Sequence, residues 1–236
     1  MRYKLYYWPE IQGRGEFIRL ALEDAGADYV DVLRGSGDFS FPKRFMPFAL
    51  PYLVAGKLVV SQSANILQYL GPRLRLAPKG EAGRLWVHQL QLTIADWLVE
   101  VHDTHHPIGS GLYYEDQKRE SKRRSADFLA VRLPKYLRYF EDVLRRAQGS
   151  YLLGRTCSYA DLSLFQMVEG LRHAFPVAFG RTERSFSRIL KVRDGVAARP
   201  RLAAYLASAR RIPFNRMGIF RHYPELDLVG KKSKKT

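Results

Sequence analysis

The chain has 236 residues, of which 46% are hydrophobic and 26% are charged, which is ordinary for a globular protein of one large or two small domains. No segment approaches the roughly 18 to 20 consecutive apolar residues that a membrane span needs. Residues 1–5 lack the apolar stretch of a secretory signal, and the single cysteine, Cys157, excludes an intrachain disulfide. Together these features predict a cytoplasmic protein.

The formal net charge is +16, from 39 basic and 23 acidic side chains. Such an excess could attract nucleic acid, anionic membranes or acidic substrates. A nucleic-acid site is expected to combine basic and aromatic side chains in one groove, but the basic stretch 118–124 contains no aromatic residue. The pattern therefore predicts a solvated basic face and a basic flexible tail over residues 226–236. It favours neither nucleic acid nor a membrane as the partner.

The first part of the chain predicts alternating strands and helices. Residues 3–8 are aromatic and apolar, which is typical of a buried strand, and Pro9 ends it. From Gly15 the apolar residues recur at helical spacing as far as Gly26, which suits a helix C-terminus. Residues 29–33 predict a second strand.

A loop with several glycines and prolines separates this unit from a hairpin and a helix. Two apolar runs, residues 50–54 and 57–60, are joined by Ala55-Gly56, which indicates a tight turn. Residues 61–70 predict a short helix that packs its apolar side inward. The order of elements over this part is β-α-β-β-β-α.

Beyond Gly71-Pro72 the pattern changes to helices alone. Helical periodicity, interrupted by glycine and proline, runs through five segments: 82–102, 118–147, 160–175, 185–198 and 200–209. We therefore expect an α/β domain over residues 1–76 and an all-α domain over residues 82–225.

Four motifs, in this order, resemble those of cytosolic glutathione transferases. They are Tyr7-Trp8-Pro9 with Gly13-Arg14, Leu50-Pro51 with the helix 61–70, Ser158-Tyr159-Ala160-Asp161, and the stretch 198–208. From about residue 3 to residue 209 the sequence resembles the tyrosine-type classes, which are pi, mu, alpha and sigma. The resemblance implies a thioredoxin-like domain that binds glutathione, an all-helical bundle that holds the second substrate, and a homodimer.

The same resemblance implies an enzyme that ionises the glutathione thiol and directs it at small hydrophobic electrophiles, as in detoxification. Glutathione is then a co-substrate, and no other cofactor is expected. A free thiol has a pKa of about 8.5, so little thiolate exists at neutral pH. A phenol beside the sulfur can favour the anion by donating a hydrogen bond.

The tyrosine that would face the thiol is Tyr7 or its neighbour Tyr6. Other classes of the family use serine or cysteine near this point, but residues 9–15 contain neither. The Tyr-Trp-Pro sequence favours Tyr7, although the interval from Tyr7 to Gly13 is one residue longer than in the pi class. The alternative is that both tyrosines, with Tyr3, only fill the core beside the first strand.

Further glutathione-binding residues follow from the resemblance. Leu50, which precedes a cis Pro51, is expected to make strand-like hydrogen bonds with the cysteinyl part. Gln62 and Ser63 open a helix whose free N–H groups and dipole favour an anion, so they are expected to bind the γ-glutamyl end. The alternative is that Ser61 or Ser63 is only a helix cap.

Charged residues are expected at both ends of the tripeptide. Arg14, Lys43 and Arg44 are candidates for the glycyl carboxylate, and the two loop residues equally fit a plain surface charge. Asp96 matches an acidic residue that reaches across the dimer to the glutathione amine in related classes. Its alternative is an exposed helix carboxylate.

A histidine-rich segment also has spacings that suit a metal, namely His102, Asp103, His105 and His106. The resemblance instead puts this segment at the mouth of the site for the second substrate, so no metal is expected. Isomerase and peroxidase activities stay open beside the transferase activity. The alternative function is a non-catalytic glutathione-binding carrier or scaffold of the same fold.

Overall fold

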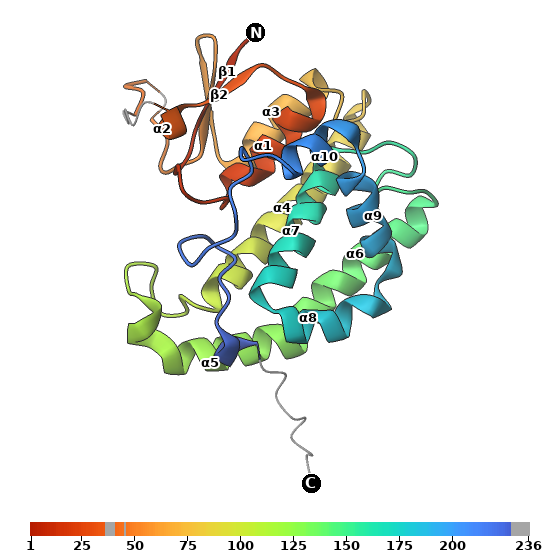
Figure 1. Ribbon diagram of the computed structural model, residues 1–236. Coiled ribbons are helices and arrows are strands. Elements are labelled where there is room, and N and C mark those ends of the chain that lie inside the picture. Colours follow the sequence, from red (N-terminus) through yellow and green to blue (C-terminus); the bar gives the residue numbers. More distant parts are fainter. Residues whose placement is uncertain (36–40, 45, 228–236) are drawn as a thin grey trace.

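The computed structural model describes residues 1–35, 41–44 and 46–227. An α/β unit that contains the N-terminus is stacked on the end of a longer helical unit (Figure 1). The predicted fold class, a thioredoxin-like α/β domain followed by an all-helical bundle, is confirmed. The roles assigned to residues 1–76 and 82–225 stay predictions.

The α/β unit is built on a four-stranded mixed sheet with the strand order β2-β1-β3-β4. Strand β1 (Tyr3–Tyr6) pairs in parallel with β2 (Tyr29–Asp31) and antiparallel with β3 (Tyr52–Ala55). Strand β3 forms the predicted hairpin with β4 (Leu58–Ser61). The register sets Tyr6 opposite Tyr52 and Tyr52 opposite Ser61, which brings the end of β1 close to the residues that follow β4.

Two helices pack on this sheet through an apolar cluster. Helix α1 (Gly15–Ala25) contributes Ile18 and Leu22, and α3 (Ser63–Arg73) contributes Ile66 and Leu70. Gly26 ends α1 with a φ of 63°, as expected for a glycine at this position. The predicted second strand is shorter than expected, because the chain turns at Val32 into a single helical turn, α2 (Val32–Gly35), which buries Leu33.

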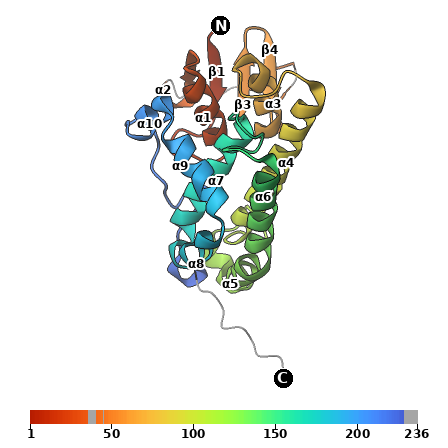
Figure 2. The same cartoon turned by 90° about the vertical axis from the view of Figure 1, so that its right-hand side faces the viewer.

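Seven helices of the helical unit are described: α4 (Glu81–Asp103), α5 (Lys118–Asp127), α6 (Leu133–Ala147), α7 (Tyr159–Ala174), α8 (Pro176–Thr182), α9 (Ser187–Ala197) and α10 (Pro200–Leu206). A π-helical turn, Phe128–Arg132, joins α5 to α6. The predicted helix 118–147 is therefore continuous, with a π-helical turn in its middle. Helices α4 and α6 run side by side (Figure 2), and Trp97 stacks on Tyr136 between them with ring centroids 5.1 Å apart.

Helix α8 was not predicted, because its capping group comes from a distant part of the sequence. Pro176 begins the helix, and the carboxylate of Asp227 accepts hydrogen bonds from the N–H groups of Val177 and Ala178 at 2.7 and 2.8 Å. The free N–H groups of a first turn need such a partner. Helix α3 also extends further than predicted, to Arg73, with Pro72 inside it.

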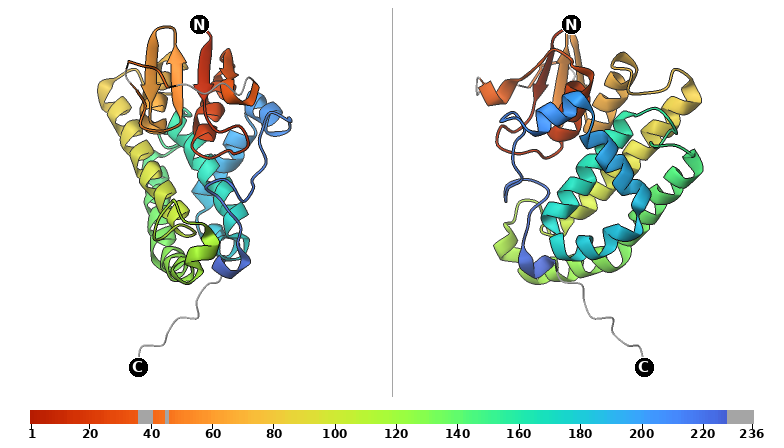
Figure 3. Two further views of the ribbon diagram at one scale, coloured as in Figure 1. Left: turned by 90° about the vertical axis from the view of Figure 1, so that its left-hand side faces the viewer. Right: turned by 45° about the vertical axis from the view of Figure 1, so that its right-hand side comes forward.

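The segment after α10 runs back along the helical unit to a short 3-10 helix, η4 (Pro224–Leu226), beside α5 (Figures 1 and 3). The side chain of Asn215 donates to the carbonyl of Glu10, and Ser125 donates to the carbonyl of Leu226. Leu226 and Asp227, which the sequence places in the basic tail, are buried. The rest of that predicted tail, residues 228–236, lies outside the described residues.

Within the part of the chain that the structure describes, no helix combines the length and the apolar character that crossing a membrane requires.

Candidate functional site

The side chain of Tyr7 lies against the first residues of α1. Its hydroxyl oxygen accepts a 2.8 Å hydrogen bond from the backbone N–H of Arg14. A β-carbon at Gly13 would lie 2.1 Å from this oxygen, and one at Gly15 would lie 2.5 Å from Cδ1 of the ring. The two glycines therefore allow the ring to approach the backbone closely, and Tyr7 is only 4% exposed.

The environment of Tyr7 keeps its phenol protonated. Burial raises the pKa of Tyr7, while the N–H of Arg14 and the charges of Arg14 and Arg19 act in the opposite direction. Because the hydroxyl oxygen already accepts from an N–H, its own proton stays available for an acceptor on a ligand.

Tyr6 points away from this position. It stacks on Tyr52 of the neighbouring strand, with ring centroids 4.3 Å apart and an angle of 13° between the ring planes. Of the two candidate tyrosines, Tyr7 therefore reaches the start of α1, and Tyr6 packs along the sheet.

The start of α3 is connected to both of the neighbouring segments. The Leu50–Pro51 peptide bond is cis, as expected, and the carbonyl of Pro51 accepts a 3.4 Å hydrogen bond from the hydroxyl of Ser61. The hydroxyl of Ser63 donates to the carbonyl of Arg14 at 3.3 Å. Since neither serine hydroxyl caps the helix, the interpretation of Ser61 or Ser63 as a plain cap is wrong.

Gln62, immediately before α3, has a strained backbone. Its φ of 70° is uncommon for a residue other than glycine, and no side chain caps the helix that follows. Strain of this kind costs on the order of 1–3 kcal/mol and gathers at functional sites. The N–H groups of the first turn of α3 are thus presented beside the segment that holds Tyr7 and Arg14.

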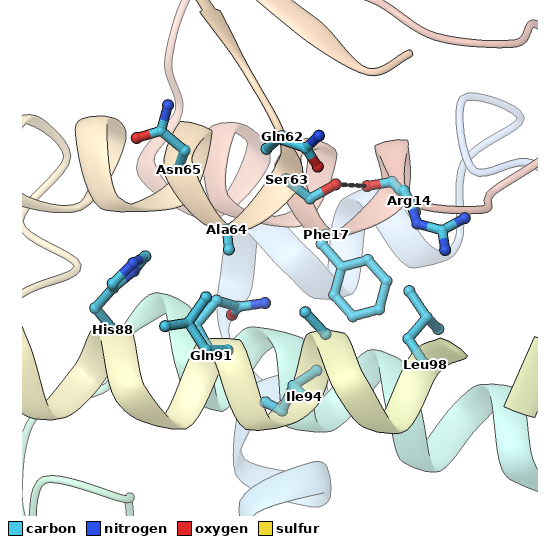
Figure 4. Close-up of a pocket in the computed structure, with 12 residues that line it drawn as sticks. Arg14, Phe17, Gln62, Ser63, Ala64, Asn65, His88, Gln91, Ile94 and Leu98 are labelled. Carbon is cyan, nitrogen blue, oxygen red and sulfur yellow. Dashed lines mark hydrogen bonds between the residues drawn. The ribbon is translucent and has the colours of Figure 1, made fainter. Parts of the chain in front are cut away.

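A cleft of about 280 Å³ lies between the start of α3 and the middle of α4 (Figure 4). Arg14, Gln62 and Ser63 line it on one side. Its apolar surface comes from α1, α3 and α4, through Phe17, Ala64, Leu92, Ile94, Ala95 and Leu98. The cleft therefore joins a basic and polar edge to an apolar interior.

Sequence comparisons find similarity to glutathione S-transferases. The family model for the glutathione S-transferase C-terminal domain matches residues 102–209. A glutathione S-transferase of Plasmodium yoelii yoelii is 25% identical over 173 residues, which cover 70% of this chain and 76% of that protein. Glutathione S-transferase P 10 of Caenorhabditis elegans is 26% identical over 207 residues, with 86% and 90% covered.

Comparison with solved structures shows the same fold. The pi-class glutathione S-transferase of Onchocerca volvulus has a TM-score of 0.69 and 24% identity, and the match covers 92% of this chain and 99% of that one. Prostaglandin synthase D of Nilaparvata lugens has a TM-score of 0.71 and 21% identity, covering 90% and 100%. The chain is therefore similar to glutathione S-transferases in sequence and in fold.

Several residues expected at the site lie outside the cleft. Lys43 and Arg44 are exposed in the loop before β3. Asp96 is exposed on α4, although its neighbour Ala95 lines the cleft. Tyr7 and the Leu50–Pro51 pair also lie outside the cleft lining, although Tyr7 is hydrogen-bonded to the backbone of Arg14, which lines it. The roles of these residues in binding stay predictions.

Three polar residues that line the cleft were missed in the sequence. Asn65 belongs to α3, while His88 and Gln91 belong to α4. His88 and Gln91 share a helix face with Ala95 and Leu98, at spacings of three, four and three residues. A polar pair on an otherwise apolar face was the available signal in the sequence.

The histidines at the end of α4 pack against the C-terminal segment of the chain. His105 Nε2 lies 2.8 Å from the carbonyl oxygen of Ile219, which can only accept, so this nitrogen carries the proton. His106 is within hydrogen-bond distance of the other ring nitrogen. Burial lowers the pKa of His105 to about 3 and that of His106 to about 4, so both rings are neutral at pH 7.

The histidine cluster does not form a metal site in the structure. Over residues 1–35, 41–44 and 46–227, no group of three or more histidine, cysteine or acidic side chains is arranged to hold a metal ion. The three rings instead contact one another, with centroid distances of 4.6 to 5.2 Å.

Proposed function

We propose that this chain is a glutathione S-transferase that attaches glutathione, through its sulfur, to small hydrophobic electrophiles in the cytoplasm, with Tyr7 as the hydrogen-bond donor to the sulfur. The observation that carries the proposal is the hydrogen bond from the N–H of Arg14 to the Tyr7 oxygen. It leaves the phenolic proton free to donate, in a position beside the start of α3 where the family binds glutathione.

In the proposed reaction, the glutathione thiol loses its proton to solvent and the phenol of Tyr7 donates to the resulting thiolate. The thiolate then forms the new S–C bond while the leaving group departs with its electron pair. Each unit by which the thiol pKa falls corresponds to about 1.4 kcal/mol, which one charge-assisted hydrogen bond can supply. A buried phenol is suited to this donation because burial keeps it protonated.

Glutathione would lie across the edge formed by the cis proline and the first turn of α3. The backbone of Leu50 would hold the cysteinyl part, and Gln62 and Ser63 would hold the γ-glutamyl carboxylate. Arg14 and Lys43 would attract the glycyl carboxylate. The electrophile would enter between Tyr7 and the segment that contains His102 and His106, where burial keeps the imidazoles neutral and compatible with an apolar substrate.

We further propose a homodimer, in which the exposed face of α4 meets a second copy of the chain. Leu85, Leu92 and Val99 recur every seven residues on this helix and are all exposed. Phe48, in the loop before β3, is 94% exposed. Exposed apolar side chains along one face of a helix, such as Leu85, Leu92 and Val99, are typical of an interaction surface. Asp96 lies on the same helix and would reach the glutathione of the other copy.

The decisive test is conjugation of glutathione to a chloronitrobenzene, with glutathione affinity measured on the same samples. Tyr7→Phe removes the donated proton and keeps the ring, so we expect turnover to fall by roughly 10- to 100-fold with affinity nearly unchanged. Tyr6→Phe, a matched change one residue away, is expected to retain turnover. Binding without turnover in the wild-type protein would favour a carrier, and no binding would exclude the proposal.

A further inference from the structure

One arginine of the C-terminal segment carries a charge that no carboxylate neutralises in the described part of the chain. Arg221 lies on the segment that follows α10 and is partly buried. Its guanidinium donates to two backbone carbonyls of its own turn, those of Gly218 at 2.7 Å and Met217 at 3.4 Å. These bonds hold the guanidinium in place, but only an anion can neutralise its charge.

The turn that carries Arg221 is fixed beside the histidines at the end of α4. The carbonyl of Ile219 lies 2.8 Å from Nε2 of His105. The rings of His102 and His106 lie against that of His105, with centroid distances of 5.2 and 4.6 Å. Burial lowers the pKa of all three histidines, and the positive charge of Arg221 acts in the same direction. The guanidinium therefore faces neutral rings.

The same histidines lie between Arg221 and the start of α1. Figure 4 shows the guanidinium of Arg14 at the end of the cleft where Leu98 lies. His102 is four residues beyond Leu98 on α4, so it continues the same helix face by one turn. Since the backbone of Arg14 holds the hydroxyl of Tyr7, a path leads from the phenol past His102 to Arg221.

The charge of Arg221 is suited to an anion that comes from outside the chain. The carboxylate beside this cluster belongs to Asp103, and it lies 3.5 Å from Nδ1 of His102 rather than against Arg221. A partly buried cation without a counter-charge is unfavourable, and a guanidinium binds a carboxylate through two parallel hydrogen bonds. A ligand carboxylate at this position would supply the missing charge.

We propose that the electrophile carries a carboxylate and that Arg221 binds it. The apolar body of the electrophile then lies on the neutral rings of His102 and His106, and its reacting carbon faces the sulfur beside Tyr7. The inference rests on the proposed function and narrows its substrate class to hydrophobic electrophiles with one carboxylate. Arg221 lies beyond residues 102–209, which the family model matches, so this specificity belongs to the C-terminal segment of this chain.

The test compares two electrophiles that differ only in this charge. They are a chlorodinitrobenzoate and the corresponding chlorodinitrobenzamide, each with its chlorine para to the carboxylate or amide. In both, the glutathione sulfur forms the new S–C bond and chloride leaves with its electron pair. We expect Arg221→Gln to lower the benzoate-to-benzamide ratio of kcat/KM by at least about tenfold, with the KM for glutathione nearly unchanged. Arg221→Lys keeps the charge without the fork, and should give an intermediate ratio.

The matched control is Arg181→Gln, which removes the same charge from an exposed position on α8. It should keep the wild-type ratio, because a general loss of positive charge acts equally in both variants. Each ratio is taken within one variant, so a partial loss of folded protein does not change it. Binding is measured separately by calorimetry with dinitrobenzoate and dinitrobenzamide, which lack the chlorine and do not react.

An unchanged ratio in Arg221→Gln, or an equal fall in Arg181→Gln, would overturn the inference. In both cases the benzamide is still conjugated, so the proposed function stands. If the wild-type protein conjugates neither compound, the proposed function fails and calorimetry decides the fate of the anion site. A preference for dinitrobenzoate that Arg221→Gln abolishes supports the site, and the lack of such a preference rejects it.

Discussion

The hydroxyl oxygen of Tyr7 accepts a 2.8 Å hydrogen bond from the backbone N–H of Arg14, the residue that also accepts from Ser63 at the start of α3. One backbone segment thus holds the phenol and the helix N-terminus in fixed relation. Both hydrogen bonds use backbone atoms of Arg14, so they do not depend on its side chain. They depend on Gly13 and Gly15, which allow the ring of Tyr7 to approach the backbone. Gly13, the residue before Arg14, is therefore the position at which this dependence can be tested by substitution.

Gly13→Ala should disable Tyr7 without removing it. The β-carbon would lie 2.1 Å from the hydroxyl oxygen, and the φ of 42° is unfavourable for alanine, so the ring must move away from Arg14. We expect conjugation to fall by roughly 10- to 100-fold, as for Tyr7→Phe, with a lower thermal midpoint. Gly180→Ala, where a β-carbon meets nothing within 4 Å, should change neither quantity much. Full activity in Gly13→Ala would contradict the role of this contact.

The histidines at the end of α4 predict a loss of stability in mild acid. The pKa of His105 is lowered to about 3, and the groups that face it are His102, His106 and Arg221. The unfolded chain binds a proton near pH 6.5 and the folded chain does not, so the stabilisation is complete above pH 6.5 and is lost as the pH falls toward 3.

His105→Gln measures this effect directly, because glutamine can donate to the carbonyl of Ile219 but does not titrate. Between pH 7.5 and pH 5, we expect the free energy of unfolding of the wild-type protein to fall by about 2 kcal/mol more than that of the variant. Urea unfolding at the two pH values gives both numbers. Equal losses in the two proteins would show that His105 does not carry the pH dependence.

Most of the fold follows from local patterns in the sequence. The Gly26 helix end, the hairpin at Ala55-Gly56 and the long amphipathic helices each depend on neighbouring residues, and all were predicted. Helix α8 was not predicted, because the carboxylate that caps it belongs to Asp227, about fifty residues away. The helical turn after Asp31 was not predicted either, since Val32 and Leu33 are equally typical of a strand.

The sequence favoured Tyr7 over Tyr6 through the Tyr-Trp-Pro motif, and its role at the thiol stays a prediction. Successive side chains along a strand point to opposite faces, which accounts for the different directions of Tyr6 and Tyr7 at the end of β1. The polar pair His88 and Gln91 on the apolar face of α4 was a signal in the sequence, but the cleft itself was not predictable because α3 forms its other side. Contacts between α3 and α4 depend on the packing of two units, and no single stretch of sequence encodes them.

The contact between α1 and α10 predicts a measurable contribution to stability. Arg199 forms a two-pronged ion pair with Asp24, at 2.5 and 2.8 Å, and the Asp24 side chain is only 4% exposed. Asp24→Asn should lower the free energy of unfolding by about 1–3 kcal/mol, because it leaves the guanidinium without its charged partner. Asp142→Asn is the control, because it breaks a pair with Arg145 in which both side chains are 57% exposed. This variant should change the free energy of unfolding by less than about 0.5 kcal/mol. Equal effects would contradict the role of burial.

The exposed face of α4 gives a prediction about assembly. Leu85 and Val99 are 60% and 44% exposed, and neither lines the cleft. In the double variant Leu85→Lys and Val99→Lys, acidic residues three or four positions away support the new lysines, so the helix itself is not weakened. We expect the dissociation constant of the dimer to rise by roughly 100-fold or more in sedimentation velocity.

Val131→Lys and Val177→Lys, at positions that are 54% and 50% exposed on other elements, form the matched control and should stay dimeric. The affinity of the monomeric double variant for glutathione then tests the proposed role of Asp96. If Asp96 holds the glutathione ammonium across the dimer, affinity and assembly are lost together, because the acceptor leaves the site when the two copies part. A monomer that keeps the wild-type affinity would contradict this role of Asp96.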